Sequence, residues 1–403
     1  MTATLSWVDL TSSDRDKVRR ILDLFREQGT VDELGLGRLR DMLSDALFPG
    51  TSVLHTRLRY ALFVPWIYRL IEQARLPSGR LSKAVRDKEL ALIQALSESS
   101  DTQGIIGIQA RHTLARMPST VYWAALSRWG IFVPGGSQGW YHANYGRMQS
   151  ESNEVAHADD PGVIWSRSPT WHPRLPPVPD GFPEQADFDL SQEDAEFFQS
   201  RWLERCPNTL LAHLAEHGSA APAENLWEDP DVLSARPRVA AVIALAERFS
   251  LHVEGAPLVY NLMLAQRRLD HDKRREDEEW VEHYREELDA WAEQETAQPH
   301  FDPNQMWQLA AQSGTNVPGP LRHFLERWSE RVRTVGAAAV GTDKSTRALI
   351  ENRELQLKGP QRARFANHAR LLDWSGAVGV GRMSFRWPRV RQLLIDLHTG
   401  LER

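Results

Sequence analysis

Cysteine is almost absent from this chain of 403 residues, which contains a single one, Cys206. One thiol cannot form an internal disulfide, ligate an iron–sulfur cluster or build a zinc site from several cysteines. Long apolar runs are missing too: the longest, near residues 60–68 and 239–246, are far shorter than the roughly 20 residues of a membrane span. The first residues contain no signal-peptide pattern. We therefore expect a cytoplasmic protein that does not enter a membrane.

Two familiar catalytic signatures are missing as well. The sequence contains no G-x-x-x-x-G-K-[ST] loop, which cradles nucleotide phosphates, and no H-E-x-x-H motif, which holds zinc on one helix face. We therefore expect no cofactor and favour a role other than catalysis.

Charge is segregated along the chain, although the net charge is only −6. Residues 1–150 have a net charge of +5, residues 151–335 of −17 and residues 336–403 of +6. Such asymmetry indicates separate surfaces for different partners. The basic ends could follow a phosphate backbone, whereas the acidic middle could pair with a basic protein or with those ends.

Apolar periodicity and helix-breaking residues predict a mainly α-helical fold. We expect an N-terminal helical domain over residues 1–150, a proline-rich strap over 151–190, an acidic helical domain over 191–335 and a basic module over 336–403. Seven prolines over 161–183 exclude a helix there, and the tryptophans among them favour a docked strap. Helices are predicted over 18–28, 37–47, 51–71, 81–96, 119–129, 191–205, 208–217, 237–251, 320–335, 343–357, 361–372 and 390–401, with a turn or hairpin over 131–146.

A longer helix is predicted over residues 257–297, because no proline or glycine follows Pro257 in this stretch. Its second half is densely charged but keeps a stripe of Trp280, Tyr284, Leu288 and Trp291. A narrow apolar stripe on so polar a helix indicates one packed seam. We assign the stripe to partner binding; the alternative is a helix that lies across its own domain.

The last 60 residues carry the pattern of a nucleic-acid-binding module. Two predicted helices, which include Lys344 and Arg347, are followed by a glycine-rich segment over 376–387 that predicts a β-hairpin, as in a winged helix. Arginines bind phosphates through two hydrogen bonds, and exposed aromatic rings between them stack on bases. The residues assigned to nucleic-acid binding are Arg362, Arg364, Arg370, Arg382, Arg386, Trp387, Arg389 and Arg391. The alternative is a small cap whose arginines pair with the acidic middle domain.

A weak metal candidate lies at His213, Glu216 and His217, which match H-x-x-E-H. Two histidines four residues apart share a helix face and can ligate zinc, while the glutamate acts as a general base. Gly218 follows at once, and histidines near a helix C-terminus are also favoured by the helix dipole alone.

Several segments resemble an uncharacterised bacterial domain family. They are Asp32–Gly37, Leu47–Ser52, Thr56–Tyr68 and Lys358–Pro388, so the resemblance spans nearly the whole chain. The family has no established chemistry, and no catalytic residue can be carried over from it. Its members are often encoded near helicase or nuclease genes in antiphage defence loci, and the resemblance implies a defence role here.

These observations predict a non-enzymatic, nucleic-acid-associated subunit of a bacterial antiphage defence assembly. Its basic C-terminal module would bind phosphates, with DNA the expected nucleic acid, and its acidic middle would hold a partner such as a helicase or nuclease. Two alternatives stay open: a zinc-dependent hydrolase built on His213, Glu216 and His217, and a pure protein-interaction scaffold.

Overall fold

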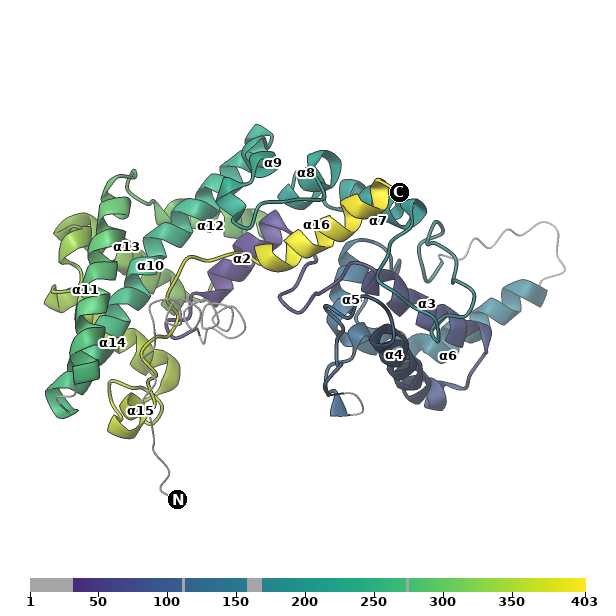
Figure 1. The fold of residues 1–403 in the computed structure, drawn as a ribbon, viewed down its shortest axis with the longest axis horizontal. Helices are drawn as coiled ribbons and strands as arrows, with labels where there is room; N and C mark the ends of the chain where they lie inside the picture. Colours follow the sequence, from purple (N-terminus) through teal and green to yellow (C-terminus); the bar gives the residue numbers. More distant parts are fainter. Residues whose placement is uncertain (1–31, 111–112, 158–168, 273–274) are drawn as a thin grey trace, which may run out of the picture. The chain divides into compact units, whose positions relative to one another are not determined.

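The computed structural model describes residues 32–110, 113–157, 169–272 and 275–403 (Figure 1). Helices dominate these ranges, and their one β-bridge, an isolated one, pairs Phe132 with Trp171. The predicted mainly α-helical fold is therefore confirmed, while the helix expected over 18–28 lies outside the described residues. The described part of the chain divides into two compact units: residues 32–40 with 245–383 belong to unit 1, and residues 41–244 with 384–403 to unit 2.

Unit 2 is built around a mostly buried helix, α3, whose first nine residues are all buried. Ten of the fourteen residues of α3 are buried, and α3 packs against α4 and α5, as expected for a core helix. The C-terminal helix α16 packs against α7 and α8. The helices of this unit are α3 (Tyr60–Gln73), α4 (Leu81–Ser97), α5 (Pro118–Arg128), α6 (Gln138–His157), α7 (Gln192–Arg205), α8 (Leu210–His217), α9 (Pro230–Leu233) and α16 (Trp387–Leu401), with short 3-10 turns at Ser78–Arg80 and Leu226–Glu228.

Two predictions in unit 2 are corrected. The helix expected from residue 51 begins only at Tyr60, because the Tyr122 hydroxyl accepts hydrogen bonds from the backbone N–H groups of Thr56 and Arg57 and so satisfies that backbone outside a helix. The turn or hairpin expected over 131–146 gives way at Gln138 to α6. The proline-rich strap is docked where it is described, since Trp171 and Phe182 are buried.

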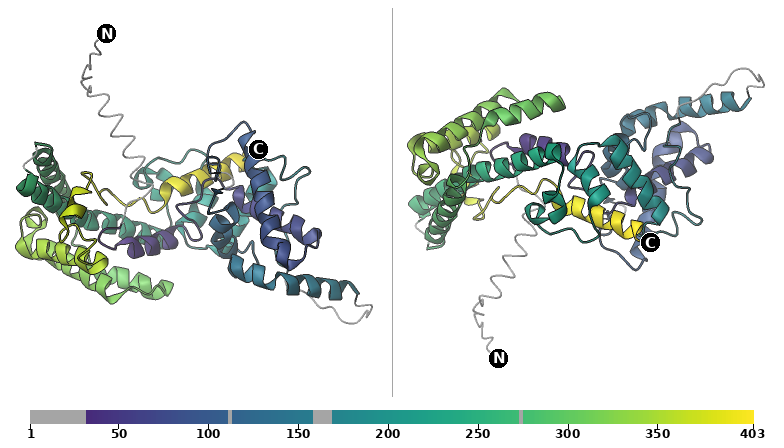
Figure 2. Two further views of the ribbon diagram at one scale, coloured as in Figure 1. Left: turned by 90° about the horizontal axis from the view of Figure 1, so that it is seen from below. Right: turned by 90° about the horizontal axis from the view of Figure 1, so that it is seen from above.

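Unit 1 is a bundle of helices, and its green members form one group in both views of Figure 2. α2 (Gly37–Leu47), which the sequence predicts with the same bounds, and α10 (Pro237–Asp272) each cross the boundary between the units. The remaining helices are α11 (Arg275–Thr296), α12 (Pro303–Ser313), α13 (Gly319–Val335), α14 (Lys344–Lys358) and α15 (His368–Leu372), with a 3-10 turn at Ala337–Ala339.

The single helix predicted over 257–297 is wrong. α10 begins at Pro237 and ends at Asp272, and α11 returns along it, so that Trp291 Nε1 donates a 2.7 Å hydrogen bond to the Leu251 carbonyl. Residues 270–279 contain no apolar side chain. A straight helix continued through these residues would bury no apolar surface there, whereas a reversal of the chain direction buries the stripe of α11 inside unit 1.

The stripe on α11 packs inside unit 1. Tyr284, Leu288 and Trp291 are all less than 9% exposed, and the Tyr284 hydroxyl donates a 2.6 Å hydrogen bond to the Gly376 carbonyl. Trp280 packs against Trp374, with ring centroids 6.0 Å apart. This packing corrects the partner-binding assignment: the stripe is the seam by which α11 lies across its own domain.

The β-hairpin predicted over 376–387, and with it the winged-helix module, is wrong. Residues 376–386 form turns and extended segments without strand pairing. Gly376, Gly379 and Gly381 have positive φ angles, which break a strand. The backbone is held instead by α10: Asn261 exchanges two hydrogen bonds with Val378, at 2.7 and 3.0 Å.

None of the described helices combines the length and apolar character that a membrane span requires.

Candidate functional site

The predicted basic and aromatic row over residues 382–391 is divided between the two units. Arg382 belongs to unit 1, where its Nε lies 2.6 Å from Glu254 Oε2 and its Nη2 donates to Gln294 at 2.8 Å. Residues 386–391 belong to unit 2. Arg382 is therefore held by an acid of the middle region, as the alternative interpretation expected for these arginines.

The unit 2 members of that row are also used internally. Arg386 Nη1 donates to Asp45 Oδ1 and to the Thr51 carbonyl, both at 2.7 Å. Trp387 is only 1% exposed and donates through Nε1 to a backbone carbonyl, so its ring is not free to stack on a base. Arg391 donates to the Pro222 carbonyl at 2.9 Å, whereas the half-buried Arg389 has no side-chain partner among the described residues.

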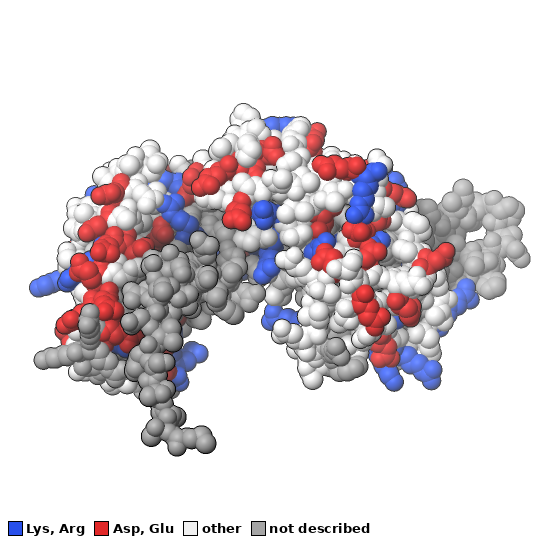
Figure 3. Space-filling view, in the orientation of Figure 1, with Lys and Arg blue, Asp and Glu red and all other residues white. Residues whose placement is uncertain are grey.

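The predicted cations from the end of α14 to α15 divide into half-buried and exposed ones. Arg364 Nη1 lies 2.8 Å from Glu33 Oε1, and Lys358 pairs with the same glutamate and with Glu354. Arg362 and Arg370 are exposed and make local bonds, to the Lys358 carbonyl and to Asp373 respectively. On the face drawn in Figure 3, the described lysines and arginines lie among acidic residues rather than in one basic area.

Four cations of unit 1 meet in one groove of about 640 Å³. Arg267 comes from α10, Arg285 from α11, and Lys344 and Arg347 from α14. The groove also contains two acids, Asp270 and Glu351, so its formal charge is +2. This groove is our candidate site, because cations from three helices converge on a single cavity.

Two of these cations are available to a ligand. Lys344 is exposed and has no hydrogen-bond or ion-pair partner in the described part of the chain. The Arg285 side chain is 58% exposed, and its ion pair with Glu282 on the same helix spans 3.4 Å. Pairs of this exposed kind contribute little, so both cations can turn to an incoming anion.

The other two cations are held more firmly. Arg267 lies over the Phe365 ring, 5.2 Å from its centroid, and 3.4 Å from Glu351. Arg347 is half-buried and donates to the Gly341 carbonyl at 3.0 Å. Burial, together with repulsion from Arg267, lowers the pKa of Arg347 below its usual value. An anion bound between the two guanidinium groups would offset that repulsion.

The H-x-x-E-H match lies at the end of α8. His213 is buried and its Nε2 lies 3.0 Å from the Asp231 carbonyl, while Glu216 pairs with Arg236 at 2.9 Å. The rings of His213 and His217 are 5.0 Å apart. No group of three or more metal-binding side chains is found among the described residues. The structure thus gives each side chain of this motif a local partner, and no further ligand lies beside it in the described ranges.

A serine, a histidine and a glutamate meet inside unit 1, a contact that sequence spacing does not reveal. His252 Nδ1 lies 2.7 Å from Glu295 and Nε2 lies 2.8 Å from Ser329, the order of a hydrolytic triad. All three are less than 9% exposed, and Phe301 stacks on the imidazole at 4.6 Å. Burial raises the pKa of Glu295, but bonds from His252 and Arg248 outweigh it and lower that pKa to about 2. We interpret the group as a buried network that joins α10, α11 and α13.

The run Gly135–Gly139 matches the G-x-S-x-G pattern of hydrolase nucleophile elbows. In that fold a strand precedes the serine and a helix follows it. Here only the helix is present in the described residues, and Ser137 Oγ accepts a 3.0 Å hydrogen bond from the Trp140 N–H. Ser137 therefore acts as a cap of α6.

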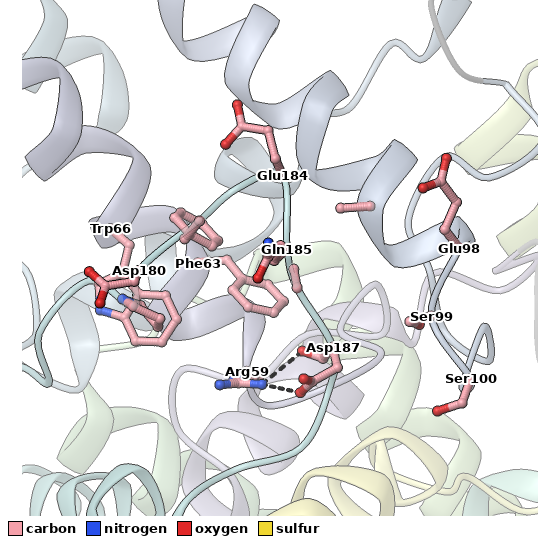
Figure 4. A pocket seen from close by; sticks show the side chains of 14 residues that line it. Arg59, Phe63, Trp66, Glu98, Ser99, Ser100, Asp180, Glu184, Gln185 and Asp187 are labelled. Carbon is pink, nitrogen blue, oxygen red and sulfur yellow. Dashed lines mark hydrogen bonds and ion pairs between the residues drawn. The ribbon is translucent and has the colours of Figure 1, made fainter.

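A second cavity, of about 530 Å³, lies in unit 2 between α3, the end of α4 and strap residues 179–187 (Figure 4). Its acids are Glu98, Asp180, Glu184 and Asp187. The Arg59 guanidinium lies over the rings of Phe63 and Trp66, at 5.7 and 5.9 Å, and bonds to Asp187. Since the chain's own cation already covers these rings, we assign no ligand to this cavity.

Comparison with known proteins identifies the family. Residues 2–399 match the family of unknown function DUF6361, and the chain belongs to that family. No protein with a curated description and no solved structure is detectably similar to it.

Proposed function

We propose that this member of the family is a non-enzymatic subunit that binds the phosphate backbone of a nucleic acid in the groove of unit 1. The observation that carries the proposal is the convergence of Arg267, Arg285, Lys344 and Arg347 on one cavity. Phosphate contacts from lysine and arginine supply most of the sequence-independent affinity of nucleic-acid-binding proteins.

The proposal moves the site away from the row over residues 382–391. The side chains of Arg382, Arg386 and Trp387 are committed to partners in the chain, whereas Lys344 and Arg285 are exposed. A role in an antiphage defence assembly is part of the same proposal and rests only on the family resemblance described from the sequence.

The test is the salt dependence of binding to a labelled oligonucleotide, measured by fluorescence anisotropy. Arg285→Gln with Lys344→Gln removes two phosphate contacts, which should flatten the plot of log affinity against log salt by about 1.4 on a single strand or about 1.8 on a duplex. A matched control exists on α13, where Arg322 and Arg327 are exposed and paired with Glu326 and Glu330.

Changing Arg322 and Arg327 to glutamine alters the net charge by the same amount but should leave the slope nearly unchanged. An equal loss of slope in both variants would mean that net charge rather than the groove drives binding. No measurable affinity of the wild-type chain at low salt would refute the proposed function.

The scaffold alternative is the second candidate, and one set of contacts favours it. Arg382 pairs with Glu254, Arg386 with Asp45 and Arg364 with Glu33, so these three basic side chains are neutralised within the chain, the first of them by the acidic middle. Changing Arg382 and Arg386 to glutamine should then lower the melting temperature without altering the salt slope of nucleic-acid binding.

A further inference from the structure

We infer that the groove of unit 1 takes single-stranded nucleic acid in preference to a duplex; this inference rests on the proposed function. The first argument is size. A cavity of about 640 Å³ is in the range of small-ligand sites, roughly 300–1,000 Å³, and so accommodates one or two nucleotide units rather than a stretch of double helix.

The second argument is the placement of the cations on different walls. Arg267, Arg285 and Lys344 come from α10, α11 and α14, and Arg347 is half-buried within the cavity. A duplex is stiff over roughly 150 base pairs and holds its phosphates on a convex surface. A single strand can bend into the groove and turn successive phosphates toward opposite walls.

The third argument is a surface on which an unpaired base can stack. The Arg267 guanidinium lies over the Phe365 ring, and its side chain remains 38% exposed. Unpaired bases stack on guanidinium planes and aromatic rings, whereas bases in a duplex are already stacked on one another. Arg267 therefore combines a phosphate-compatible charge with a stacking plane.

Arg267→Lys separates these two roles, because lysine keeps the charge and loses the plane. On a single strand this change should weaken binding by roughly 5- to 100-fold while the salt slope stays unchanged. Arg267 also donates to the Phe365 carbonyl, so the melting temperature of the variant is measured alongside. A loss of affinity at an unchanged melting temperature supports stacking.

The deciding experiment needs only the wild-type chain. Anisotropy titrations compare one labelled DNA strand, the RNA strand of the same sequence and the DNA duplex, each at several salt concentrations. At least about tenfold tighter binding of either single strand than of the duplex is expected, and the tighter of the two strands identifies the nucleic acid. If the duplex binds as tightly as the single strands or more tightly, the preference for a single strand is overturned. The proposed function still stands in that case if the salt slope is reduced in the variant with Arg285→Gln and Lys344→Gln. Absence of binding to all three overturns both.

Discussion

Gly255, inside α10, is a position where one added methyl group should damage the packing of unit 1. A Cβ atom there would lie 2.4 Å from Cζ2 and 2.5 Å from Cη2 of Trp291, whereas carbon atoms in contact are normally about 3.5–4.0 Å apart. Trp291 cannot easily yield, because it is 2% exposed and its Nε1 donates to the Leu251 carbonyl at 2.7 Å. The added atom must therefore push α10 and α11 apart.

Two opposing effects set the size of the change. Overpacking typically costs about 1–3 kcal/mol and occasionally more. Replacing a glycine by alanine within a helix stabilises it by about 1 kcal/mol. Since the steric overlap exceeds 1 Å, we expect Gly255→Ala to lower the unfolding free energy by about 2 kcal/mol, measured by urea denaturation followed by circular dichroism.

Trp291→Phe supplies the internal check, because phenylalanine lacks the indole atoms nearest to the added Cβ. In that background Gly255→Ala should be neutral or stabilising, which gives a coupling of about 2–3 kcal/mol in a double-mutant cycle. Gly319→Ala is the control in the same unit, since nothing lies within 4 Å of the added atom, and it should change stability by less than about 0.5 kcal/mol. An equal cost of Gly255→Ala with and without Trp291 would refute the packing of α11 along α10.

Two further predictions concern buried titratable groups in unit 2. Burial raises the pKa of Glu89 from 4.5 to about 7. Between pH 4.5 and pH 7 the carboxyl group therefore keeps its proton in the folded protein but loses it in the unfolded chain. Raising the pH through this range should lower the unfolding free energy by about 3 kcal/mol. Glu89→Gln should remove this part of the pH profile, and an unaltered profile would contradict it. Burial also raises the pKa of Cys206 to about 11. This thiol should react with a disulfide reagent at pH 8 only after denaturation; rapid labelling of the native protein would show that it is accessible.

The sequence predicted a helix well where one short segment contains both its apolar periodicity and its capping residues. α2 has the predicted bounds, and the capping box expected at Ser191 is formed with Asp194 at the start of α7. The predictions failed where distant residues decide the outcome. The glycines at 376–381 predicted a hairpin, because no local signal shows that Asn261 binds the backbone of Val378 between them.

The candidate site shows the same limit. Lys344 and Arg347 stood out because they lie in a basic helix, but Arg267 and Arg285 were hidden in a strongly charged stretch. Only the packing of α11 and α14 against α10 brings these four cations together. Likewise, the sequence shows the charge of Arg386 but not that Asp45, more than 300 residues earlier, would neutralise it.

The discontinuous course of unit 2 has a consequence for how the protein folds during translation. Its α16 packs against α7 and α8, yet the whole of residues 245–383 is synthesised between them. Domains emerging from the ribosome fold as their residues become available. Unit 1 can therefore be complete while the surfaces of α7 and α8 that pack against α16 are still uncovered, and we expect the nascent chain to be most prone to aggregation during that interval.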